Sequence, residues 1–148
     1  MTWEIGVAWF HYISIMVMAA CLISEHLLLK PDVTVPQART LQALDAVYGI
    51  SAGVVIATGV ARIFLEKGAY YYLHHFAFHA LIGIFVVVGL LSIYPTVIIL
   101  RWRAETRADR APVIAPGQFK AMQMVMRLEI VLLMLAPLFA AWMAHKAY

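Results

Sequence analysis

Charged side chains are scarce in this sequence. Only 13% of its 148 residues are Asp, Glu, Lys or Arg, about half the share in an average soluble domain. Hydrophobic residues make up 64%, which is more apolar surface than a soluble globule of this length can bury. A soluble enzyme and a disordered protein are therefore excluded. The net charge of +3 is too small to indicate nucleic acid as a partner.

Cysteine is almost absent as well. Cys21 is the only one, so an internal disulfide and a Cys-rich metal site are both excluded. Because Cys21 lies within an apolar run, we expect it to pack as a small hydrophobic residue.

Long apolar runs are what the sequence does contain. Each is long enough to cross the roughly 30 Å of membrane hydrocarbon as a helix, and none alternates as a barrel strand does. The four runs cover residues 5–29, 44–65, 77–100 and 122–144. The sequence predicts an all-α integral membrane four-helix bundle, with residues 1–148 forming one transmembrane domain.

The basic residues predict the orientation of this bundle. Eight Lys and Arg residues lie in or beside the first and third connections: Lys30, Arg39, Arg101, Arg103, Arg107, Arg110, Lys120 and Arg127. The other side carries Arg62, Lys67 and Lys146. The positive-inside rule therefore predicts that residues 101–121 form a cytoplasmic loop and that both termini lie on the periplasmic or outer side.

Small residues are concentrated in the second apolar run. Gly49 and Gly53 form a small-xxx-small pair, which allows two helix backbones to approach closely. We expect this pair to pack against another helix of the same bundle, and dimerisation is the alternative.

Ionisable residues near the cytoplasmic ends of the runs form a first candidate site. Ionisable groups inside a membrane are costly and suggest a function. These are Glu25, Asp45, Arg127 and Glu129. One interpretation is a structural ion-pair network around Arg127. The other is part of a proton or metal-ion path.

Histidines on the opposite side form a second candidate site. His11 and His79 lie in the same leaflet, and neutral imidazole is a common ligand of haem iron. As axial ligands they would leave Arg62 and Lys67 to pair with haem propionates. The sequence leaves open whether each histidine is a ligand or a hydrogen-bonded structural residue.

The chain resembles a bacterial family of four-helix inner-membrane proteins of unassigned function. The segments that carry the likeness are DAVYG at 45–49, the loop around Glu66-Lys67-Gly68, and GLLSIYPT at 89–96 followed by RWR at 101–103. This resemblance implies a multi-pass protein of the bacterial inner membrane.

A more distant similarity is to small haem-containing protoporphyrinogen IX oxidases and copper-resistance D-type membrane domains. It rests on His11-Tyr12-Ile13 and on Arg127-Leu128-Glu129-Ile130, and it implies His11 as a haem ligand. Leu81 stands near the place of a lysine in those oxidases, and Glu25-His26 replaces a Pro-Arg pair. These departures argue against protoporphyrinogen oxidase activity but not against haem.

Three hypotheses of function follow. The first is a b-type haem-binding protein, a haem-dependent membrane oxidoreductase linked to quinol or porphyrin chemistry. The second is an accessory or structural subunit of a larger membrane complex. The third is a metal-ion or proton transporter. In each the lipid bilayer is a partner, and a homo-oligomer or a larger complex is compatible with all three.

Overall fold

The computed structural model describes residues 2–65 and 68–145, and they form helices without a strand. Four of the helices are long: α1 (Thr2–Leu28), α2 (Val35–Leu65), α4 (Phe76–Arg101) and α6 (Pro116–His145). Two are single turns that join the long ones: α3 (Ala69–Leu73) and α5 (Arg103–Arg107). The all-α prediction is confirmed, and α3 and α5 are additions to it.

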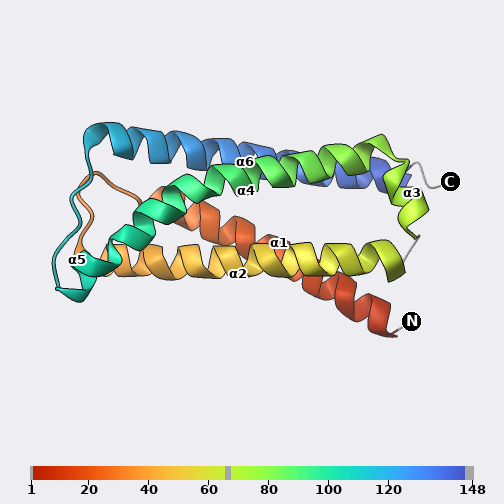
Figure 1. The fold of residues 1–148 in the computed structure, drawn as a ribbon, viewed down its shortest axis with the longest axis horizontal. Coiled ribbons are helices and arrows are strands. Elements are labelled where there is room, and N and C mark those ends of the chain that lie inside the picture. The colour runs from red at the N-terminus through yellow and green to blue at the C-terminus, as the bar shows by residue number, and fades with distance from the viewer. Residues whose placement is uncertain (1, 66–67, 146–148) are drawn as a thin grey trace.

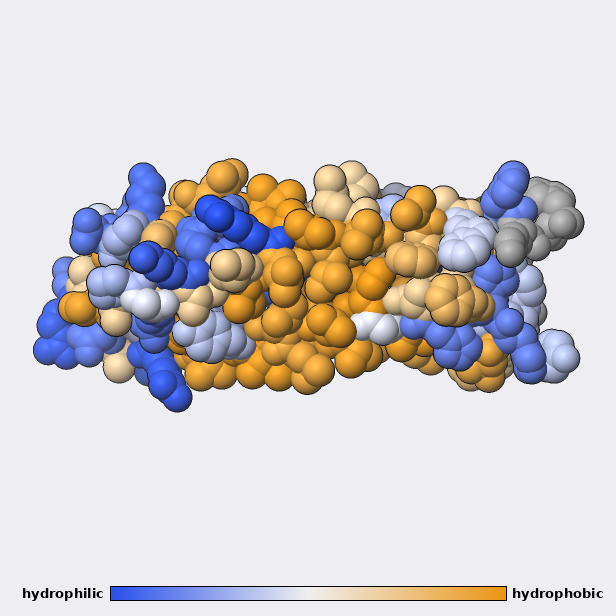
Figure 2. Space-filling model, turned by 90° about the horizontal axis from the view of Figure 1, so that it is seen from above, coloured by the Kyte–Doolittle hydropathy of each residue, from blue (hydrophilic) through white to orange (hydrophobic). Residues whose placement is uncertain are grey.

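The four long helices are also long and apolar enough to cross a membrane. On the face drawn in Figure 2, an apolar band covers the middle of the molecule and polar residues gather at its two ends. This is the surface that a bundle surrounded by lipid requires, because hydrocarbon cannot hydrogen-bond polar groups.

The long helices are arranged as two packed pairs, α1 with α2 and α4 with α6. Smaller contacts join α1 to α6 and α2 to α4, whereas no Cα atom in the described part of α1 lies within 8 Å of one in α4. Both termini lie at one end together with α3, which we call the terminal end (Figure 1). Residues 29–34 and 102–115 lie at the other, which we call the basic end.

The start of α2 lies nine residues before the apolar run predicted at 44. Thr34 and Gln37 form a reciprocal capping box: Thr34 N donates to Gln37 Oε1 at 3.0 Å, and Gln37 N donates to Thr34 Oγ1 at 3.4 Å. This cap nucleates a polar first segment of α2 that the apolar pattern alone does not reveal.

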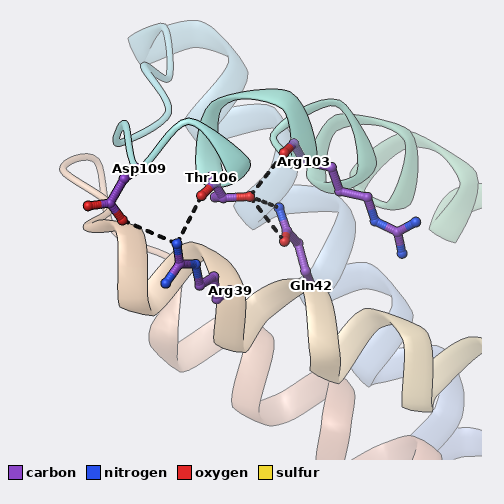
Figure 3. A network of polar contacts seen from close by, with 5 residues as sticks. All are labelled: Arg39, Gln42, Arg103, Thr106 and Asp109. Atoms are coloured by element: carbon purple, nitrogen blue, oxygen red, sulfur yellow. Dashed lines mark hydrogen bonds and ion pairs between the residues drawn. The ribbon is translucent and has the colours of Figure 1, made fainter.

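The turn α5 is fastened to this polar segment of α2 (Figure 3). Arg39 donates to the Thr106 carbonyl at 3.0 Å and pairs with Asp109 at 3.2 Å. Gln42 donates to Thr106 Oγ1 at 3.3 Å. The connection after α4, which the sequence predicted only as a cytoplasmic loop, therefore folds back onto α2 at the basic end.

The helix α4 changes partner along its length. It lies beside α6 near the terminal end and crosses toward α2 and α5 near the basic end (Figure 1). Pro95, buried within α4, has no N–H for the carbonyl of Leu91, and such a missing bond favours a helix bend. The bend places the last turns of α4 over α2.

The prediction that Gly49 and Gly53 pack inside the bundle was wrong. Both are exposed, and a Cβ atom added at either would meet nothing within 4 Å. The face of α2 that is buried carries larger side chains, among them Asp45, Tyr48 and Val55.

Close approach between helices occurs instead at Gly59. A Cβ atom added there would lie 3.3 Å from Cε1 of His11 on α1. The imidazole therefore occupies the space that a side chain at position 59 would take, and this glycine sets the distance between α1 and α2 near the terminal end.

We expect Gly59→Ala to destabilise the protein relative to Gly53→Ala. The added methyl group must displace the His11 ring, an overpacking cost of about 1–3 kcal/mol, whereas Gly53→Ala meets open space and gains helix propensity. Melting temperatures of the two variants in the same detergent provide the measurement. Equal melting temperatures would contradict the close approach at Gly59.

Candidate functional site

Three carboxyl groups lie inside the bundle. Glu25 of α1, Asp45 of α2 and Glu129 of α6 are only 2%, 6% and 0% exposed. Each comes from a different helix, and each interacts electrostatically with the other two. We call these three residues the acidic cluster.

The fourth long helix, α4, supplies a hydroxyl group to the acidic cluster and another to the neighbouring Tyr48. Thr96 Oγ1 donates a 2.6 Å hydrogen bond to Asp45 Oδ1. Tyr48, one turn after Asp45, is buried and interacts with Ser92, one turn before Thr96. Asp45 is therefore held across the boundary between α2 and α4.

The carboxyl groups of Glu25 and Glu129 have fewer hydrogen-bond partners than that of Asp45. Oε1 of Glu25 and both carboxyl oxygens of Glu129 are buried without a hydrogen-bond partner among the described residues. Apolar core residues share their helix faces: Met18 and Leu22 on α1, and Met122 and Met126 on α6. Burying a carboxyl group without a partner costs several kcal/mol if it is ionised, so the acidic cluster requires positive charge from elsewhere.

Arg127, the expected partner, lies outside the acidic cluster. It is exposed on the lipid-facing side of α6, whereas Glu129 on the same helix is fully buried. Two residues along a helix correspond to about 200°, which places the two side chains on opposite faces. Among the four polar residues that the sequence grouped, the structure thus brings together Glu25, Asp45 and Glu129.

The cation that acts on the acidic cluster is Arg103 of α5. It interacts electrostatically with Asp45, and its guanidinium extends away from Asp109 (Figure 3). Arg103 is exposed at the basic end. It reaches this place because α5 is fastened to α2 through Arg39 and Gln42.

Nearer the terminal end, the side chain of His11 reaches from α1 to α2. Its Nδ1 lies 2.9 Å from Thr58 Oγ1, and that hydroxyl donates to Val54 O at 2.6 Å. The Thr58 proton is thus already used, so His11 Nδ1–H is the donor to Thr58. This bond fixes the tautomer and the orientation of the imidazole ring.

The haem hypothesis also named His79, Arg62 and Lys67. His79 is exposed on α4, and its Nδ1 lies 3.2 Å from the His75 carbonyl. Arg62 lies in the neighbourhood of His11, because its guanidinium is 5.0 Å from the centre of the Tyr12 ring, and that ring adjoins the His11 ring. Lys67 falls outside the described residues. Within residues 2–65 and 68–145, no three His, Cys, Asp or Glu side chains form a metal-binding group.

Sequence reasoning missed Thr96, the partner of Asp45, and Ser92, the partner of Tyr48. Both are uncharged, so a search for ionisable groups passes over them. Both lie in the segment GLLSIYPT, and Asp45 and Tyr48 lie in DAVYG. The two segments that carry the family likeness therefore meet in space at the acidic cluster, a signal that was present in the sequence.

The fold and the buried acids define a small all-helical membrane protein with a polar site inside its bundle. Residues 3–146 match the model of the family described as predicted membrane protein (DUF2214), and the chain belongs to that family. No curated protein and no solved structure matches the chain.

We expect Thr96→Val to destabilise the protein by about 1–3 kcal/mol, because a buried carboxyl oxygen loses its hydrogen bond while the side-chain shape is kept. Thr40→Val is the matched control, since Thr40 is exposed and its hydroxyl bonds to Pro36 O within its own helix. Chemical unfolding in detergent measures both. A Thr96→Val variant as stable as the control would show that the bond to Asp45 contributes nothing.

Proposed function

We propose that this protein translocates protons across the membrane and that the acidic cluster is its proton-binding site. The observation that carries the proposal is the burial of Glu25, Asp45 and Glu129 with no cation in hydrogen-bonding contact among the described residues. Of the three functions that the sequence suggests, this is the transporter hypothesis, with the proton as the transported ion.

The energetics of the acidic cluster favour a proton as the bound cation. Several carboxylates at one buried site repel one another, and each loses hydration energy. A bound proton removes the charge of one carboxylate and gives it a hydrogen to donate to a neighbour. A metal ion would need several converging oxygen ligands, and the described residues form no such group.

Polar residues continue from the acidic cluster toward the terminal end. Ser51 is buried on α2 two turns beyond the level of Asp45, and Ser14 is half-buried on α1. Thr58 and His11 follow them. Imidazole exchanges protons near neutral pH, and His11 shares a face of α1 with Glu25. We assign His11 as the proton-exchanging group of this half, with water between the side chains.

In this proposal the basic end faces the cytoplasm, as the distribution of Lys and Arg predicts. Arg103 and α5 then lie on the cytoplasmic side of the acidic cluster. The two termini and His11 lie toward the periplasmic or outer side of a bacterial inner membrane.

A flux measurement in liposomes tests the proposal. Purified protein is reconstituted with a pH-sensitive dye inside, and a potassium diffusion potential drives proton entry. We expect wild-type vesicles to acidify faster than empty ones. Glu129→Gln and Glu25→Gln should reduce the rate to that of empty vesicles, because the amide keeps the side-chain shape but binds no proton.

Glu105→Gln is the matched control for this experiment. Glu105 lies on α5 in a solvent-exposed ion pair with Arg110, at 2.9 Å, so its removal should leave the flux unchanged. Wild-type vesicles that acidify no faster than empty ones would overturn the proposal.

Haem binding is a second candidate, and one observation favours it. The Thr58 hydroxyl accepts from His11 Nδ1, and a metal-binding histidine usually has such a partner on its second ring nitrogen. His79 is exposed on α4. We therefore restrict the hypothesis to His11 as a single axial ligand of a b-type haem.

An absorption spectrum decides this candidate. If His11 binds haem iron, protein expressed with ample haem should show a Soret band that His11→Ala abolishes. His79→Ala and His26→Ala should leave the band unchanged, because His79 is exposed on another helix and His26 lies toward the basic end. Protein that purifies colourless and takes up no added haem would exclude the candidate.

A further inference from the structure

Two cations of α6 face the surroundings of the bundle. Lys120 and Arg127 are both exposed, and a spacing of seven residues returns nearly to the same face after two turns. Arg127 lies eleven residues after the first residue of α6, which is roughly 16 Å along the helix. No ion pair connects either cation to an acid within the described part of the chain.

Between these two cations lies a shallow groove. It is lined by Phe119, Lys120, Gln123, Met124 and Arg127. The Gln123 side chain donates to the carbonyls of His26 and Leu29, at 3.2 and 3.1 Å, where α1 ends. The groove therefore lies beside the junction of α6 with the C-terminal end of α1.

The position of Arg127 raises a physical problem that the protein itself does not solve. A guanidinium group on the lipid-facing side of a spanning helix is costly, and it reaches toward the headgroups to remain hydrated. Near the basic end, hydrophilic surface does interrupt the apolar band (Figure 2). An anion in the headgroup layer would supply the missing counter-charge.

We propose that this groove binds an anionic phospholipid from the leaflet at the basic end. The phosphate lies between Lys120 and Arg127, and an acyl chain packs against Met124 and Phe119. Charge complementarity favours this occupant. Both cations lack an acidic partner among the described residues, and anionic lipids gather near clusters of Lys and Arg. The site is independent of proton translocation by the acidic cluster.

Native mass spectrometry of the detergent-purified protein tests the site. Titration with phosphatidylglycerol should give bound lipid at concentrations at which phosphatidylcholine gives little. Arg127→Gln and Lys120→Gln should each weaken phosphatidylglycerol binding about fivefold, the effect of one lost cation at an anionic surface. Arg127→Lys should retain most of the binding because it keeps the charge.

Arg107→Gln is the matched control. It removes the same charge at the same end of the molecule, but Arg107 is exposed on α5, outside the groove. We expect phosphatidylglycerol binding of this variant to equal that of wild type. Equal weakening by Arg107→Gln and Arg127→Gln would show that only the general charge of the basic end attracts lipid, and equal binding of the two lipids would also overturn the site. Melting temperatures in phosphatidylcholine check that each variant is folded.

Discussion

The burial of three carboxyl groups that form no ion pair among the described residues is the constraint on which the interior of this protein depends. Glu25, Asp45 and Glu129 come from three helices and lie among methionine and leucine side chains. Water normally supplies both hydrogen bonds and charge stabilisation to such groups, and inside this bundle the protein must replace it. It does so for Asp45 through Thr96, and it provides the two glutamates with no comparable partner among the described residues.

The arrangement of α4 and α5 follows from the same need. Thr96 reaches Asp45 because α4 crosses from α6 toward α2 near Pro95. Arg103 acts on Asp45 because α5 folds back onto the polar start of α2, where Arg39 and Gln42 hold it. The connection at the basic end is therefore part of the site as well as a link between spans.

Much of the fold could be predicted from the sequence. Membrane spans are defined by their length and apolar composition, and the four apolar runs have both. The candidate acids could also be found, since Glu25, Asp45 and Glu129 are conspicuous in apolar runs. Arg127 could have been separated from Glu129 by helix geometry alone. Arg103 could not have been found, because its place depends on how residues 102–115 fold back.

The packing prediction for Gly49 and Gly53 was wrong for a different physical reason. In water, an apolar or small-residue face of a helix is a face that must be covered. In a membrane, lipid is as apolar as the core, so the pattern does not say which face is inside. The contact of His11 with Gly59 likewise depends on the register of α1 against α2, which no local pattern specifies.

The division of the bundle into two helix pairs has a mechanical meaning. Because no Cα atom of α1 lies within 8 Å of one in α4, the pair α1–α2 and the pair α4–α6 meet along the smaller α1–α6 and α2–α4 contacts and through α3 and α5. The hydrogen bond from Thr96 to Asp45 crosses this boundary, while Glu25 and Glu129 belong to opposite pairs. A sliding of one pair past the other, as in shear motions of packed helices, would change the distances from Glu129 to Glu25 and to Asp45 together. The charge on the acidic cluster and the relative position of the two helix pairs are therefore coupled.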